Sequence, residues 1–305
     1  MEQSENVPRE TSIPRSKECP ICGGLEFETS LLLIDHSVSK EKFEIARCLG
    51  CGFKTTQPIP SDLNPYYDSD DYISHSKTKR GIINQLYHLA QRYNLGWKYR
   101  KVKKHAAGNV WLDYGSGAGD FLRFLRDHHI KVAGVEPHDP VREQCLKDGF
   151  NVMTPETYLD TSQPCDVITM WHVLEHVENL FDVIAKHKAN LSDQGILAIA
   201  VPNPDSYDAH HYKQYWAAYD VPRHLWHFTE KDIRAVSAKA GFEFITTYGM
   251  VLDSYYISLL SEKYKNGNFA AAVINGLRSN ISALFKRTPY SSQIYILRKT
   301  SSGAR

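Results

Sequence analysis

The chain has 305 residues, of which 42% are hydrophobic and 23% charged, which allows one large catalytic domain plus a small module. The N-terminus is polar and acidic without an apolar leader, and no run approaches the roughly 20 apolar residues of a membrane span. These features argue against a secreted or membrane-spanning protein, and we expect a soluble, cytoplasmic one.

The net charge of +1 conceals an uneven distribution. Residues 77–105 hold 9 Lys and Arg, residues 263–305 hold 8, and neither segment has an acidic residue. The region 106–262 has 12 basic against 22 acidic residues, a net charge of −10. Two basic segments on a nearly neutral protein indicate either a local site for an anionic group or solvated helix faces.

Residues 1–16 are expected to be flexible and to precede a zinc ribbon at 17–57. Four of the six cysteines form two C-x-x-C pairs with the spacing of a structural zinc site: Cys19, Cys22, Cys48 and Cys51. Four thiolates leave no open position on the ion, so the site is expected to be structural. Two disulfides, the alternative, need an exporting context that the N-terminus does not indicate.

Strands are expected between the two cysteine pairs, at Phe27–Asp35 and Lys42–Arg47. Residues 1–57 hold 7 basic and 9 acidic residues, a balance that would repel phosphates and disfavours a nucleic-acid partner. Cys145 and Cys165 fit neither pair and are expected to be packing residues.

Residues 58–108 are expected to form a linker and a basic helical segment. The linker is rich in proline and tyrosine, and Tyr72 and His75 are candidates for closing a pocket from this side. Apolar residues then recur at helical spacing, at Ile82, Leu86, Leu89 and Tyr93. The basic residues of 77–105 lie on this helix, which Gly108 is expected to end.

A strand, a glycine loop and a helix start follow at 110–122, with the sequence VWLDYGSGAGDFL. The glycines permit a tight turn and a close approach of the backbone to a ligand at the helix N-terminus. The third glycine comes one residue early for the dinucleotide pattern G-x-G-x-x-G, and Asp120 stands in its place. Because this carboxylate would repel a pyrophosphate, we expect a ligand other than a phosphate ester.

Four further strands are expected to alternate with helices, at Val132–Val135, Phe150–Met153, Asp166–Met170 and Gly195–Val201. Glu136 follows the first of them, where a carboxylate can accept hydrogen bonds from both ribose hydroxyls. The alternation predicts a doubly wound α/β sheet with ligands at the carboxyl ends of its strands.

The motif HVLEH occupies residues 172–176, directly after Trp171. The order H-x-x-E-H is that of inverted zinc metalloproteases, in which two ligands and a base share one helix face. That reading needs His172, Glu175 and His176 to converge on an open zinc. The preceding strand instead delivers Trp171 and His172 to the ligand edge of the sheet, so we interpret the motif as the lip of the ligand pocket, with Glu175 and His176 supporting His172.

Three stretches, together with Glu136 at the acidic end of the second strand, resemble the class I S-adenosylmethionine (SAM) methyltransferases. The stretches are DYGSGAGD at 113–120, CDVITMWHVLEHV at 165–177 and GILAIAVPN at 195–203. The closest resemblance is to the branch of the ubiquinone-pathway O-methyltransferases, and bacterial members with a four-cysteine zinc head, including some sugar C-methyltransferases, are also similar. The resemblance implies a seven-stranded Rossmann-like methyltransferase sheet over 109–305, whose last strand is antiparallel. The sixth and seventh strands would be Phe242–Met250 and Gln293–Arg298.

The resemblance also implies the cofactor SAM and the residues around it. Its methionine part would be surrounded by Asp113, Gly115, Ser116, Gly117 and Gly119. Glu136 would hold the ribose, Pro137 and Thr154 would lie near the adenine, and Trp171 would stack near the cofactor. The N/D-P-P-Y motif of many amino-nitrogen methyltransferases is absent, which disfavours methylation of the exocyclic amine of a base.

Histidines after the fifth strand are the leading catalytic candidates. His224 and His227 lie in a segment that reaches over the catalytic pocket in this fold, and histidine titrates near neutrality. Each would act as a base or orient the acceptor; alternatively, His227 caps a turn or packs beside Trp226 and Phe228. His172, after the fourth strand, is the next candidate.

An insert or lid is expected at about 251–290. Its apolar residues have helical spacing, at Phe269, Val273, Leu277, Ile281 and Leu284, and Lys286 and Arg287 follow. We favour a buried packing helix. A substrate lid or a dimer surface is the alternative, and a basic lid suits a phosphorylated, lipid-linked or membrane-adjacent acceptor.

The predicted function is methyl transfer from SAM to oxygen or carbon of a small molecule, such as a sugar, phenolic, phosphorylated or lipid-linked compound. One alternative is an rRNA or tRNA methyltransferase with a zinc head, which the basic helix favours. Another is a SAM-binding protein without turnover.

Overall fold

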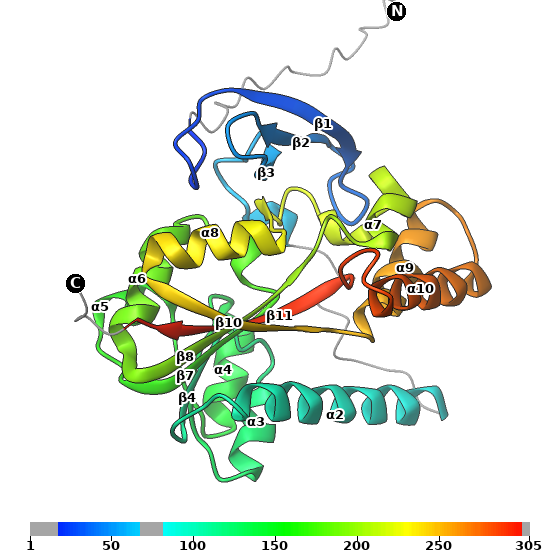
Figure 1. Ribbon diagram of the computed structural model, residues 1–305. Helices are drawn as coiled ribbons and strands as arrows, with labels where there is room; N and C mark the ends of the chain where they lie inside the picture. The colour runs from blue at the N-terminus through cyan, green and yellow to red at the C-terminus, as the bar shows by residue number, and fades with distance from the viewer. Residues whose placement is uncertain (1–17, 68–81, 301–305) are drawn as a thin grey trace, which may run out of the picture.

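The computed structural model describes residues 18–67 and 82–300. The segment 1–16 that we expected to be flexible lies outside these residues, as do Tyr72 and His75. Figure 1 shows a small sheet near the N-terminus above a larger sheet that has helices on both faces.

The larger sheet has seven strands in the order β10-β11-β8-β7-β4-β5-β6. They are β4 (Val110–Tyr114), β5 (Lys131–Val135), β6 (Asn151–Met153), β7 (Cys165–Trp171), β8 (Leu191–Pro202), β10 (Phe242–Gly249) and β11 (Ser292–Lys299). Strand β11 is antiparallel to both of its neighbours, whereas β8, β7, β4, β5 and β6 pair in parallel. The predicted methyltransferase sheet with an antiparallel last strand is therefore confirmed.

Helices cover both faces of this sheet. Side chains on both faces of β8 are therefore buried, which explains its continuous apolar run at 196–201. They include α2 (Ile82–Lys103), α3 (Asp120–Asp127), α4 (Asp139–Lys147), α5 (Pro155–Asp160), α6 (Leu180–Asn190) and α8 (Glu230–Ala240). Ile196 and Ala198 belong to a core cluster with Phe121 of α3, whereas Leu197 belongs to one with Ile184 of α6. Since successive strand residues point to opposite faces, both sets are buried.

The smaller sheet joins the cysteine-rich segment to the catalytic part. Its strands are β1 (Phe27–Ile34), β2 (Lys42–Cys48), β3 (Lys54–Gln57) and β9 (Trp226–His227), in that order. The fourth strand comes from far along the chain, and Thr55 pairs with Trp226 in antiparallel register. The two parts are therefore hydrogen-bonded to each other through one continuous sheet.

A buried ion pair reinforces this junction. The guanidinium of Arg223 donates to Asp35 at 3.0 Å and to Asp220 at 2.7 Å. Only 1% of the Arg223 surface is exposed, so removing either carboxylate would leave a charge poorly compensated.

The insert forms α9 (Asp253–Tyr264) and α10 (Phe269–Leu284), and its packing corrects one expectation. The buried face of α10 consists of Ala272, Asn275, Gly276, Ser279 and Ala283. The large apolar residues point outward, with Phe269 71% and Leu284 68% exposed. A Cβ at Gly276 would lie 2.7 Å from the Tyr255 ring, so the close approach of α9 and α10 requires small residues between them. We predicted that the apolar residues of this helix are buried. That prediction is wrong, because the helix packs through its small residues and its large apolar residues face outward.

The HVLEH stretch does not form an α-helix. His172 has a φ of 57°, and only Leu174–His176 form a short 3-10 turn, η3. His172 and His176 consequently do not share a helix face, contrary to the arrangement that the protease reading requires.

Candidate active site

The glycine loop between β4 and α3 lies at the carboxyl edge of the sheet. Gly115 has a φ of +79°, and a Cβ there would lie 2.3 Å from Val173. Gly117 has a φ of +51°, and a Cβ there would meet nothing within 4 Å. Gly115 is therefore needed because Val173 occupies the place of a side chain, whereas Gly117 borders open space.

Glu136 connects this loop to the end of β5. Its Oε2 accepts a hydrogen bond from the Gly117 N–H at 2.8 Å, and its Oε1 accepts one from the His138 N–H at 2.9 Å. Tyr114 of β4 is in register with Val135 of β5, so the two strand ends bring the glycine loop and Glu136 together. Pro137 follows Glu136 at the same edge.

Asp113 is the buried acid at the end of β4. It accepts a 2.6 Å hydrogen bond from the Thr169 hydroxyl. Burial raises the pKa of Asp113 to about 7, although Thr169 and the Lys98 ammonium oppose this shift. A carboxyl group held near its titration point would be ionised readily by a cationic ligand.

Two buried polar atoms at this edge have no hydrogen-bond partner among the described residues: Ser116 Oγ and Trp171 Nε1. Such atoms are costly unless something pairs with them. Together with the open space at Gly117, they are what a cofactor with hydrogen-bonding groups would fit. Thr154 differs, because its Oγ1 accepts from the Thr157 N–H at 3.2 Å and thereby caps α5.

His172 is the first residue after β7 and lies between two carboxylates. Its Nε2 is 3.0 Å from Asp253 Oδ2 of α9, and its Nδ1 is 3.5 Å from Glu175 Oε1. Burial opposes the charged ring, but the two carboxylates outweigh it and raise the pKa of His172 to about 9. Such a ring binds an anionic group as a cation, or accepts a proton once it is neutral.

Lys98 of α2 approaches the same place from the other side. Its Nζ lies 4.6 Å from the centre of the Trp171 ring. Burial lowers the pKa of Lys98, and the charges of Asp253 and Asp113 oppose this shift. Neither Lys98 nor Asp253 was identified as a site residue from the sequence, because each comes from a helix outside the recognised motifs. The signal for Lys98 was the basic content of residues 77–105, and the signal for Asp253 was an acidic residue at the start of the insert.

His224 lies beside the motif at residues 172–176. Its Nδ1 is 2.9 Å from the Ala218 carbonyl oxygen, and its ring meets that of His176 edge-on, with 4.5 Å between the centroids. One potential ligand atom from each of Glu175, His176 and His224 lies within 4.8 Å of the others. The structure therefore brings the motif and His224 together.

His227 lies in β9, at the junction with the small sheet. Its Nε2 is 2.9 Å from the Thr56 hydroxyl, and its ring packs against Tyr219. Burial lowers the pKa of His227 well below its usual value, with the His224 and Lys54 charges acting in the same direction. This environment matches the alternative reading of His227 as a packed residue.

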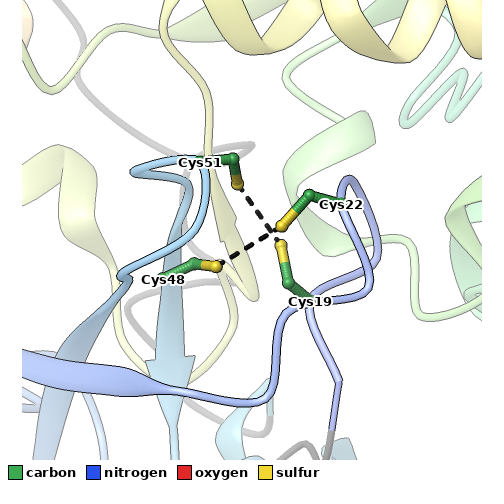
Figure 2. A group of neighbouring side chains, drawn as sticks. All are labelled: Cys19, Cys22, Cys48 and Cys51. Atoms are coloured by element: carbon green, nitrogen blue, oxygen red, sulfur yellow. Dashed lines mark hydrogen bonds between the residues drawn. The ribbon is translucent and has the colours of Figure 1, made fainter.

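The four cysteines of the two C-x-x-C pairs converge from two loops (Figure 2). Cys19 Sγ lies 3.6 Å from Cys51 Sγ, and Cys22 Sγ lies 3.6 Å from Cys48 Sγ. All four are free thiols rather than disulfides. A tetrahedral zinc site with Zn–S bonds of about 2.3 Å would have edges of about 3.8 Å, so the cluster is compatible with zinc.

Backbone N–H groups support a thiolate in this cluster. Burial opposes the charge on Cys48, but hydrogen bonds from the Cys51 and Gly50 backbone outweigh it and lower the pKa of Cys48 to about 7. Cys145 and Cys165 lie apart from the cluster and are buried in the core, as expected. Within residues 18–67 and 82–300, no helix combines the length and apolarity needed to cross a bilayer.

Comparisons with known proteins agree with this fold. A family model described as a methyltransferase domain matches residues 87–247, more than half of the chain. No curated protein matches the sequence. Magnesium protoporphyrin IX methyltransferase from Synechocystis, solved with bound SAH, has a TM-score of 0.51 and 12% identity over 78% of this chain and 98% of that chain. A SAM-dependent methyltransferase from Archaeoglobus fulgidus has a TM-score of 0.47 and 20% identity over 68% of this chain and 94% of that chain. The chain belongs to the methyltransferase domain family.

Proposed function

We propose that the protein transfers a methyl group from SAM to an oxygen or carbon atom of a small molecule that binds beside His172. The position of His172 carries this proposal: it follows β7 at the ligand edge of the sheet, and its ring lies between Asp253 and Glu175. The two flanking carboxylates raise the pKa of His172 to about 9, so its ring is a cation near neutral pH and would attract and orient an acceptor with a negative or developing negative charge.

The residues proposed to hold SAM border one region. Glu136 would bind the ribose, Asp113 would attract the cationic amino group, and Ser116 Oγ would gain the hydrogen bond it lacks. Gly115 and Gly119 would shape the loop, Gly117 would leave room for the ligand, and Pro137 and Thr154 would border the adenine. Trp171 would lie between the cofactor and Lys98.

When bound, SAM supplies an electrophilic methyl group on a sulfonium. The protein then has to align the acceptor with that group and keep water out. We propose that Lys98 and Trp171 close the site on the α2 side and that Asp253 orients His172 from the insert. The His172 imidazolium would orient the acceptor through its charge, while the acceptor's oxygen or carbon forms the new bond to the methyl group and the bond between that methyl group and the sulfonium sulfur breaks.

We further propose that Cys19, Cys22, Cys48 and Cys51 hold a structural zinc ion. The ion would fix the loops of the small sheet, and through β3 it would support β9 of the catalytic part. This role needs no open coordination position, which agrees with four thiolates as the complete ligand set.

The basic residues of α2 favour a small acceptor over RNA. Lys98 packs on Trp171, Lys101 lies 4.6 Å from the centre of the Tyr248 ring, and Lys103 bonds Asn109. These three of the five basic residues of α2 are engaged by neighbouring side chains and are less free to bind phosphates, whereas Arg92 and Arg100 are exposed. The resemblance to the ubiquinone-pathway branch points to phenolic, sugar, phosphorylated or lipid-linked acceptors.

A labelling screen tests the proposal. The purified protein is incubated with methyl-labelled SAM and a cell extract, which is then separated into small molecules, lipids, RNA and protein. We expect label in small molecules or lipids. We expect His172→Asn, which tolerates the positive φ at this position, to lose transfer while still binding SAM. Label in RNA or protein, or full transfer by the variant, would overturn the proposal.

A further inference from the structure

Glu175 is a buried carboxylate whose oxygens lack hydrogen bonds. Only 1% of its surface is exposed, and neither oxygen has a hydrogen-bond partner among the described residues. The His172 ring lies beside it, with Nδ1 3.5 Å from Oε1, but this ring is shared with Asp253. One cation therefore faces two carboxylates, and the Glu175 oxygens still lack a hydrogen-bond donor, which is costly for a buried carboxylate.

Carbonyl contacts favour one tautomer of each of the two other histidines around Glu175. His176 Nδ1 lies 3.0 Å from the Arg223 carbonyl oxygen, and His224 Nδ1 lies 2.9 Å from the Ala218 carbonyl oxygen. A carbonyl only accepts, so these contacts favour a hydrogen on Nδ1 and a free lone pair on Nε2. The Tyr67 hydroxyl also lies 3.0 Å from His176 Nδ1. A backbone carbonyl on one ring nitrogen is the usual support for a histidine that ligates metal through the other.

From these observations we propose that Glu175, His176 and His224 bind a divalent transition-metal cation. Their ligand atoms already lie within 4.8 Å of one another, and two imidazoles with one carboxylate suit Zn²⁺, Mn²⁺ or Fe²⁺ rather than the all-oxygen preference of Mg²⁺. The cation would compensate the Glu175 charge and tie η3 to the segment that carries His224. This site differs from the protease arrangement because His172 is not a ligand, and it does not depend on the identity of the methyl acceptor.

Metal binding distinguishes this site from the cysteine cluster. Mn²⁺ prefers nitrogen and oxygen over thiolate ligands, so loss of the free-Mn²⁺ electron paramagnetic resonance signal reports on the proposed site alone. Zinc content by mass spectrometry is measured in parallel. We expect one Mn²⁺ bound per chain, or one zinc beyond that of the cysteines. Glu175→Gln and His224→Ala should each weaken this binding at least tenfold, whereas His210→Ala, an exposed control, should not.

Circular dichroism and thermal melting establish that each variant is folded, and either variant alone is sufficient for the test. The proposal is overturned if the wild-type protein binds neither Mn²⁺ nor an additional zinc. It is equally overturned if a folded Glu175→Gln or His224→Ala variant binds the cation as the wild type does.

A second observation concerns the outer face of α10. Its exposed apolar residues are Phe269, Val273, Ile274, Leu277, Ile281 and Leu284, and Phe285 follows directly. Tyr256 and Leu259 of α9 are exposed as well. Isolated exposed apolar residues are common, but a stripe of this length along one helix marks a binding surface.

The charges around this face identify its partner. Arg278 of α10 and Lys286 and Arg287 directly after it are exposed, and residues 263–300 include no acidic residue. A two-fold dimer through α10 would bring these like charges together, because each copy offers the same patch. We infer that the outer face of α10 docks on an anionic lipid surface, with its apolar stripe in the interface and the cations near the headgroups.

Vesicle co-sedimentation tests this inference on the full chain. We expect binding to phosphatidylcholine vesicles that contain phosphatidylglycerol, little binding to phosphatidylcholine alone, and release at high salt. Leu277→Glu should reduce binding at least tenfold, whereas Leu146→Glu, at an exposed leucine of α4, should not. No binding to the anionic vesicles, or a dimer that Leu277→Glu converts to a monomer, would overturn it.

Discussion

The backbone N–H of Gly117 donates a 2.8 Å hydrogen bond to Oε2 of Glu136. The glycine loop after β4 and the acidic end of β5 are thereby joined through the carboxylate proposed to hold the ribose. Its other oxygen accepts from the His138 N–H, so the side chain is held in place before any ligand binds.

Glu136→Ala should therefore weaken SAM binding at least 100-fold, because hydrogen bonds to a charged group contribute about 1.5–3 kcal/mol each and two are lost. Isothermal titration calorimetry measures the affinity. Glu143→Ala, at an exposed acid of α4, is the matched control. Normal SAM affinity in Glu136→Ala would remove Glu136 from the site.

Alanine at the two loop glycines should have different effects. Gly115→Ala places a Cβ 2.3 Å from Val173 and should lower the free energy of unfolding by about 2–3 kcal/mol. Gly117→Ala meets no protein atom within 4 Å and should cost only about 1–2 kcal/mol for its positive φ. The Gly117 variant should nonetheless lose SAM affinity, since its methyl group enters the proposed ligand space. Denaturant unfolding and calorimetry separate the two effects, and an unchanged SAM affinity in Gly117→Ala would contradict this assignment.

The sheet and its ligand edge could be predicted from the sequence because they depend on the order of strands, loops and helices along the chain. The glycine loop and Glu136 each follow a strand, and parallel strands place their ends at one edge. Lys98 and Asp253 could not be predicted in this way, since they reach His172 and Trp171 from α2 and α9, whose placement depends on tertiary packing. Periodicity likewise showed that α10 is amphipathic, but only the contact at Gly276 determines that its apolar side faces outward.

SAM affinity should depend on pH through Asp113. The pKa of this buried acid is raised to about 7, and its ionised form is the one that attracts a cationic ligand. Affinity should therefore be full well above pH 7 and should fall as the pH drops below it, by up to about tenfold per pH unit. Calorimetry across this range measures the slope. Asp113→Asn should bind more weakly and lose the dependence; an identical slope in that variant would assign the titration to another group.

Asp253→Asn tests the contribution of the insert to the active site. Asp253 lies 3.0 Å from His172 Nε2, and its loss should lower kcat about 10- to 100-fold because the ring is no longer oriented or stabilised as a cation. SAM affinity should stay unchanged. The acceptor found in the labelling screen serves as substrate, and Asp160→Asn, at an exposed acid, is the control. A variant with normal kcat would leave Asp253 with a structural role only.

Loss of the zinc ion that we propose at the four cysteines should affect the catalytic part as well as the small sheet. Strand β3 lies between the cysteine loops and β9, and Thr56 binds both the His224 carbonyl oxygen and His227 Nε2. Releasing the ion should loosen β3 and with it the segment around His224. Cys19→Ser is therefore expected to lose the sulfur-to-metal charge-transfer band of the Co²⁺-substituted protein, to melt at lower temperature, and to be cut by protease near residues 217–227. Cys145→Ala, which removes a thiol far from the cluster, should keep the band and the protection. If Cys19→Ser kept the charge-transfer band, the four cysteines would not be the metal ligands. If the variant lost the band but residues 217–227 stayed protected from protease, the metal site and the catalytic part would be energetically independent.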